Sequence, residues 1–166
     1  MYAIRRMMRK SERGQSFMEL AVSIVFLLIL LTAVIDLGWA FYTMIALRDT
    51  AQEAAAYGTM CPDAYLVKMR LRASATAPLK IEDIDPNNIT VTFVNPDTSA
   101  ETTDFGKEED IVRISVFVNH KIVTPLIGTF IGTYEYPLKV NIADTVMVDL
   151  PVNPKQDDPC PWKYHP

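Results

Sequence analysis

Histidine and cysteine are scarce in this 166-residue chain, which has two of each: His120, His165, Cys61 and Cys160. None of the four stands in the close pairs that zinc ligands form. The chain also lacks a nucleophile elbow, a phosphate-binding glycine loop and a dinucleotide-binding fingerprint. We therefore expect no bound metal, no other cofactor and no enzymatic activity.

Positive charge is scarce after the first fourteen residues. Those residues carry five Lys and Arg against one Glu, so the formal charge of −4 for the chain leaves −8 on residues 15–166. This acidic remainder argues against nucleic acid as a partner. A basic start followed by an apolar segment indicates that the N-terminus stays in the cytoplasm while the rest of the chain is exported.

Charge of either sign is scarce over residues 17–47, where Glu19 and Asp36 are the two charged residues. The apolar pattern predicts one long helix over residues 15–57, with Gly58 as its C-cap. At 1.5 Å per residue this helix is about 65 Å long, twice the ~30 Å thickness of membrane hydrocarbon. We therefore expect the first half to span a membrane and the second half to stand outside it as a stem.

One face of the stem carries small apolar residues at helical spacing, which are Leu47, Ala51, Ala54, Ala55 and Gly58. Small side chains allow another element to approach closely. Two interpretations stay open: this stripe packs on the chain's own exported domain, or it packs on neighbouring subunits.

The exported part changes from helical to alternating periodicity. Residues 64–75 predict a short helix, and residues 87–96, 111–123 and 138–150 predict strands. Residues 97–110 predict a polar, solvated loop that ends in the acidic run Glu108, Glu109 and Asp110. His120, at a strand end, is expected to be solvated.

These elements predict an α+β fold, in which a long N-terminal membrane-spanning helix continues into a stem and is followed by a short helix and a small antiparallel β-sheet domain. The predicted organisation is a basic leader (1–14), the transmembrane helix and stem (15–58), an extracytoplasmic α+β domain (59–150) and a Pro-rich tail (151–166). Cys61 and Cys160 fall in the exported part, where a disulfide can form and persist. Their pairing is a possible disulfide, because a sequence does not show whether two Cα atoms come within reach.

Two ordinary explanations compete for the apolar segment. A secretory signal peptide needs a cleavage site, but the apolar sequence continues past the nearest small-x-small triplet, Gly38-x-Ala40. A plain uncleaved anchor accounts for the segment but leaves Gly14 and Glu19 unexplained.

The stretch "RGQSFMEL", residues 13–20, resembles the processing site of type IV prepilins, in which a basic leader ends in glycine and a glutamate follows five residues later. Residues 15–58 are similar to the N-terminal segment of the TadE-like pseudopilins of the Flp, or tight-adherence, pilus system. The shared features are a leucine-rich run, an Ile-Asp-aromatic-Gly motif, an aromatic pair and an alanine-rich stem. Ile35, Asp36 and Gly38 fit the motif, with Leu37 in place of its aromatic residue.

The resemblance implies that a prepilin peptidase cuts between Gly14 and Gln15 and that Glu19 serves processing and assembly. The implied protein is a minor or initiating pseudopilin, a single-pass protein of the cytoplasmic membrane with its C-terminal domain outside. The implied partners are membrane lipid, the peptidase, and other pilins and pseudopilins. The alternative is a membrane-tethered extracytoplasmic binding domain that does not polymerise.

The two acids of the apolar segment each allow a second interpretation. Glu19 is either an assembly carboxylate or a first-turn acid favoured by the helix dipole. Asp36 lies about 26 Å further along the helix axis. It is either the solvated outer end of the membrane segment or a hydrogen-bonding group between adjacent helices.

Overall fold

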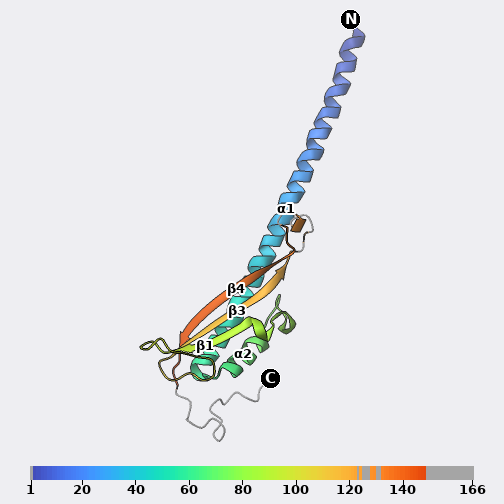
Figure 1. Cartoon of the computed structure of the whole chain (residues 1–166). Coiled ribbons are helices and arrows are strands. Elements are labelled where there is room, and N and C mark those ends of the chain that lie inside the picture. Colours follow the sequence, from blue (N-terminus) through green and yellow to red (C-terminus); the bar gives the residue numbers. More distant parts are fainter. Residues whose placement is uncertain (1, 123, 125–127, 130–131, 149–166) are drawn as a thin grey trace. The chain divides into compact units, whose positions relative to one another are not determined.

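The computed structural model describes residues 2–122, 124, 128–129 and 132–148, with side chains from residue 14 onward. The predicted tail, 151–166, lies outside the described residues. The described chain contains one long helix, one short helix, two 3₁₀ turns and four strands. Their order is α1 (Tyr2–Met60), α2 (Ala64–Ala73), η1 (Ile81–Asp83), η2 (Pro86–Asn88), β1 (Ile89–Val94), β2 (Glu101–Thr102), β3 (Ile111–Lys121) and β4 (Glu135–Thr145) (Figure 1). The expected α+β class is confirmed.

The chain divides into two compact units. One consists of residues 1–39 together with residues 122–134, and the other contains the remainder of α1, α2 and the sheet. The hairpin tip between β3 and β4 therefore groups with the N-terminal part of α1.

The sheet is antiparallel throughout, with the strand order β2-β1-β3-β4. β3 pairs with β4 along its full length, from Ile111 opposite Thr145 to Lys121 opposite Glu135. Figure 1 shows these as the two long neighbouring arrows. β4 begins three residues before the predicted strand because its pairing with β3 continues up to that point.

The prediction that residues 97–110 form a polar loop is wrong in part, because Glu101 and Thr102 form the short strand β2 beside β1. The cause is a tight turn at Asn95, whose side-chain Oδ1 accepts hydrogen bonds from the backbone N–H groups of Asp97 and Thr98 at 3.1 and 3.0 Å. Such Asx turns reverse the chain. The reversal brings the polar segment back alongside β1.

The core lies between one face of the sheet, α2 and the second half of α1. The predicted inward residues of β1 and β3 are buried, which confirms their alternation. The largest fully buried side chains in this core are Phe93, Leu47, Leu71, Ile84 and Ile114. Leu47 belongs to α1, so the stem is an integral part of the domain core.

α1 continues to Met60, so the prediction that Gly58 caps the helix is wrong. A Cβ built on Gly58 would lie 3.1 Å from Val67 Cγ2 and 3.3 Å from Val112 Cγ2. Glycine therefore allows α1 to pack closely on α2 and β3, and a larger residue there would crowd both valines. The helix ends just before Pro62, which has no N–H to continue it.

His120 is buried, with 6% of its surface exposed, so the expectation that it is solvated is wrong. It occupies the inward face of β3, and its ring meets the Tyr136 ring edge-on with 5.5 Å between centroids. The alternation of β3 extends two residues beyond Val118 and turns His120 inward.

Candidate membrane and assembly surface

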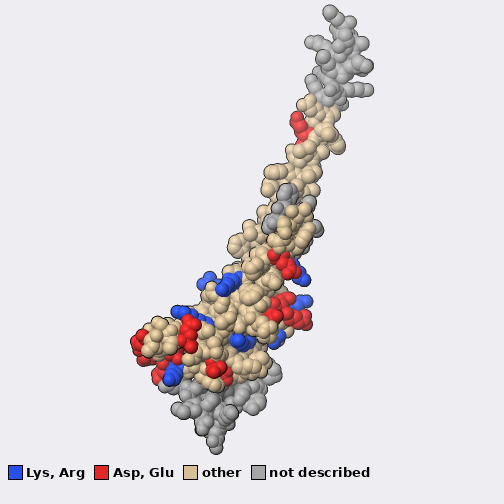
Figure 2. Space-filling view, viewed as in Figure 1, with Lys and Arg blue, Asp and Glu red and all other residues tan. Residues whose placement is uncertain are grey.

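The N-terminal part of α1 exposes a continuous apolar surface. Every described side chain from Gly14 to Leu31 is exposed, including Phe17 at 71% and Val22 at 68%. In Figure 2 the described part of this stretch is uncharged apart from one acidic spot, and Glu19 is its one charged residue. A soluble protein rarely exposes so large an apolar surface, which marks a site of contact with a membrane or with other chains.

α1 is long and apolar enough to cross a membrane. The span Gly14–Met60 has 47 residues and contains an 18-residue window with a mean hydropathy of 2.8. Of that window, 6% is buried within the chain. These properties are consistent with a single-pass membrane protein.

Two hydroxyl groups in the middle of this segment are bonded within the helix. Ser23 Oγ donates to the Glu19 carbonyl oxygen at 2.8 Å, and Thr32 Oγ1 donates to the Ile29 carbonyl oxygen at 2.8 Å. Hydrocarbon offers no hydrogen-bond partners, so polar groups inside a bilayer must be satisfied internally. Both hydroxyls meet this requirement.

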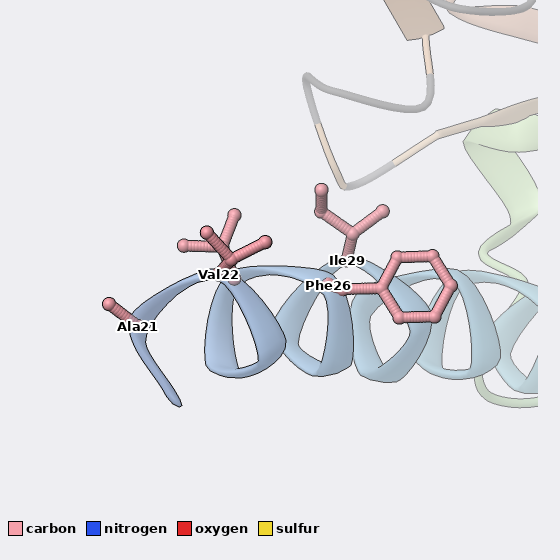
Figure 3. A pocket seen from close by; sticks show the side chains of 5 residues that line it. Ala21, Val22, Phe26 and Ile29 are labelled. Carbon is pink, nitrogen blue, oxygen red and sulfur yellow. The ribbon is translucent and has the colours of Figure 1, made fainter. Parts of the chain in front are cut away.

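One side of the segment forms a shallow apolar hollow, shown in Figure 3, that is lined by Ala21, Val22, Val25, Phe26 and Ile29. The spacing of four residues places these side chains on one face of the helix. The hollow can receive a lipid chain or the side chains of a neighbouring helix.

Gly14, Gln15 and Glu19 all lie in α1 and are exposed. A Cβ built on Gly14 would meet nothing within 4 Å, so packing within the chain does not require glycine there. Glycine in a helix interior costs about 1 kcal/mol relative to alanine. Packing among the described residues thus does not explain why position 14 is a glycine.

Asp36 is 9% exposed, so its interpretation as a solvated group is wrong. Its Oδ2 accepts a hydrogen bond from the backbone N–H of Thr124 at 3.1 Å. The sequence analysis did not identify Thr124 as a partner of Asp36. The one signal in the sequence was that the stretch between Lys121 and Glu135 contains no charged residue. A role for Asp36 between adjacent helices stays a prediction.

Gly38, the other residue of the helix motif, is exposed, and a Cβ there would meet nothing within 4 Å. An exposed glycine on a membrane helix allows the backbone of another helix to approach closely. The structure thus separates the two motif residues: Asp36 contacts its own chain, and Gly38 is open to a neighbour.

The small-residue stripe of the stem packs on the chain's own domain, which confirms the first of its two interpretations. Leu47, Ala51 and Ala54 have no exposed surface and Ala55 has 1%. At the surface, an ion pair between Glu53 and Arg70 links the stem to α2. This face of the stem is therefore already occupied.

The acidic run that ends at Asp110 and the two cysteines were the remaining candidate groups. Asp110 is 6% exposed, and its carboxylate accepts from Lys107 N at 2.8 Å and from Asn95 Nδ2 at 3.2 Å, so it fixes the loop before β3. Within the described part of the chain, no three His, Cys, Asp or Glu side chains gather as metal ligands would. Cys61 is buried, and Cys160 lies outside the described residues, so their pairing stays a prediction.

Comparison with known proteins gives one family. Residues 14–56 match the family model described as TadE-like protein, which confirms the resemblance over the apolar segment and most of the stem. The matched range begins at Gly14. No curated protein and no solved structure matches the chain.

Proposed function

We propose that this chain, with its TadE-like segment over residues 14–56, is a minor or initiating pseudopilin of a Tad (Flp) pilus system. In this proposal a prepilin peptidase removes residues 1–14, and the mature subunit assembles with other pilins through the N-terminal part of α1. The role is structural, and we assign it no catalytic step. The observation that carries the proposal is an exposed apolar helix with one carboxylate, Glu19, five residues after Gly14.

The position of Glu19 supports assembly. An acidic side chain costs roughly 2.5–3.5 kcal/mol at the centre of a membrane helix and less near the interface. Cleavage after Gly14 would create an ammonium group on Gln15, and two opposite charges about 4 Å apart gain about 4 kcal/mol at an effective dielectric constant of 20. Pairing Glu19 with the new N-terminus of a second subunit would therefore offset the cost and set the axial register of the two helices.

The size of the exported domain supports a sparse rather than a bulk role. The described domain contains a four-stranded sheet and two helices, and the buried stripe of the stem is already used to build it. The N-terminal part of α1 remains as the apolar surface open to other helices. A subunit of this kind fits the start or tip of a filament better than its repeating shaft.

The first test is cleavage. Intact-mass measurement of the protein extracted from its native membrane should give a chain that begins at Gln15. Gly14→Leu should block the cut but leave insertion unchanged, because a side chain at Gly14 meets nothing within 4 Å. Gly38→Leu is the matched control, since Gly38 is equally open and should still be processed normally.

A working protein that retains its first fourteen residues would contradict the proposal. So would a Gly14→Leu variant that is trimmed as efficiently as the Gly38→Leu control.

The second test is assembly. Glu19→Ala should leave the amount of protein in the membrane fraction unchanged, but should lower co-purification with other pilus components at least tenfold, because the charge pair is lost. Asp49→Ala is the control, since Asp49 is an exposed acid of the same helix beyond the apolar segment. If Glu19→Ala and Asp49→Ala co-purify equally well, a tethered binding domain that does not polymerise is the function that remains.

A further inference from the structure

We propose that the outer face of the sheet, formed by β1, β3 and β4, binds a polysaccharide that carries carboxylate groups. This face is turned away from the core that the sheet shares with α1 and α2, and its central residues are Thr90, Ser115, Phe117, Lys139 and Asn141. The inference goes beyond the proposed function. It concerns the sheet domain alone and does not depend on removal of the leader or on assembly through α1.

A row of polar side chains crosses three neighbouring strands of the sheet (Figure 1). Thr90 of β1 lies opposite Ser115 of β3, and Ser115 lies opposite Asn141 of β4. Residues directly opposite each other in antiparallel strands have Cβ atoms about 5 Å apart and point to the same face. Two hydroxyl groups and one amide therefore stand in line on the outer face.

The polar groups of this row are available to a ligand. Thr90 and Asn141 are exposed and Ser115 is half-buried. Their three side chains make no hydrogen bond to another residue of the described part of the chain. Hydroxyl and amide groups both donate and accept hydrogen bonds, as the hydroxyl groups of a sugar do. Exposed sheet faces bind oligosaccharides in other β folds.

Phe117 and Lys139 lie directly opposite each other in the next row of the same face. Phe117 is half-buried, at an outward position of β3 two residues from Ser115. An aromatic ring offers a large, rigid apolar area, which suits the apolar face of a sugar ring. The face thus combines an apolar platform with a line of hydrogen-bonding groups.

The charge of Lys139 favours a sugar that carries a carboxylate. The other two cations of the described outer face are paired, Arg113 with Glu101 at 3.6 Å and Lys121 with Glu135 at 3.9 Å. Lys139 is exposed and has no ion pair among the described residues. A hydrogen bond between an ammonium group and a carboxylate is stronger than one between neutral groups. A carboxylated sugar therefore complements this face better than a neutral one.

A single unpaired cation does not suit a nucleic acid. Binding to a nucleic acid backbone depends on neutralising several phosphates with Lys and Arg. Residues 15–166 carry a formal charge of −8, so the surroundings of Lys139 do not add to its attraction for a polyanion. The neutral row must then supply part of the binding, which is the feature that the experiment isolates.

The probe is polygalacturonate, in which every sugar carries a carboxylate, and dextran is the neutral comparison. Each polysaccharide is immobilised on a sensor surface, and the full chain in detergent micelles is passed over it to obtain the dissociation constant. We expect the chain to bind polygalacturonate at least tenfold more tightly than dextran.

Two substitutions separate the charge from the hydrogen-bonding row. Lys139→Gln removes the cation and Asn141→Ala removes the amide, and each should weaken binding to polygalacturonate at least fivefold. Lys107→Gln and Asn87→Ala are the matched controls, at exposed residues of the same types outside the sheet. Both controls should bind as the unaltered chain does.

The inference is wrong if the chain does not bind polygalacturonate, or if the two controls lose as much affinity as Lys139→Gln and Asn141→Ala. It is also wrong if Lys139→Gln weakens binding and Asn141→Ala does not, because the face would then recognise negative charge and not a sugar. Equally tight binding to a DNA duplex would contradict it for the same reason. None of these results bears on leader cleavage or on Glu19, so the proposed function is tested separately.

Discussion

At the scale of single residues, the three glycines of α1 have different surroundings. Gly14 and Gly38 are open, whereas Gly58 packs against the Val67 and Val112 side chains. Glycine destabilises a helix interior by about 1 kcal/mol relative to alanine, so each position needs a compensating reason. For Gly58 that reason lies within the folded domain. For Gly14 and Gly38 the proposed function places it in the peptidase and in neighbouring helices.

This difference predicts opposite results for the same substitution. Gly58→Leu should lower the free energy of unfolding of the domain by about 1–3 kcal/mol, because a larger side chain overpacks the contact with α2 and β3. Gly38→Leu should not lower it, because a side chain at this open position meets no atom within 4 Å of its Cβ and leucine favours a helix more than glycine does. Denaturation of the full chain in detergent, followed by circular dichroism, measures both, and equal midpoints for the two variants would contradict the packing described for Gly58.

At the scale of elements, α1 is one helix with two environments. Up to Leu31 its described side chains are exposed, and from Ala46 onward one face lies in the domain core. The same kind of apolar residue therefore has different roles along the helix. Before Asp36 it is mostly exposed, as the proposed contact with lipid or other helices requires, and after Ala46 it packs against the sheet and α2.

Two leucines of α1 test this division. Leu47→Ala should destabilise the domain by about 2–5 kcal/mol, because Leu47 is fully buried and its truncation leaves a cavity. Leu37→Ala should change stability by less than about 0.5 kcal/mol, since Leu37 is 58% exposed. Urea denaturation of the full chain in detergent compares them, and an unchanged midpoint for Leu47→Ala would show that the stem is not part of the core.

At the scale of the whole molecule, the described chain returns to the end of α1 before the tail begins. Met147 N–H donates to the Thr59 carbonyl at 2.9 Å, two residues before Cys61. The last described residues of the chain therefore lie close to the end of α1, where Cys61 follows. This proximity supports the predicted disulfide.

The pairing predicts that protein exported in an oxidising compartment has no free thiol. Cys160→Ser should destabilise the domain by up to about 4–5 kcal/mol, the chain-entropy value for a loop of about a hundred residues. Thiol titration of the denatured, unreduced protein makes the measurement, with the reduced protein as the control that reacts at two cysteines. Two reactive thiols before reduction would rule the bridge out.

Much of the fold was predictable because its signals are local. The helical period of α1 and the alternation of β1 and β3 follow from adjacent side chains, so their buried faces could be assigned without knowing what would cover them. Element ends and short elements were less predictable. β2 depends on a turn at Asn95, and the end of α1 depends on what Gly58 meets.

The sequence by itself determined the long apolar helix, the inward faces of the strands and the resemblance of residues 14–56 to TadE-like proteins, since each depends on neighbouring residues. Only the tertiary structure decided what the stem stripe and Asp36 contact within the chain. From the sequence, the stem stripe could pack either on its own domain or on another subunit. The structure places it in the core of its own domain. Asp36 and Thr124 are 88 positions apart. The periodicity of apolar residues along a single element cannot indicate a contact between segments so distant in the chain.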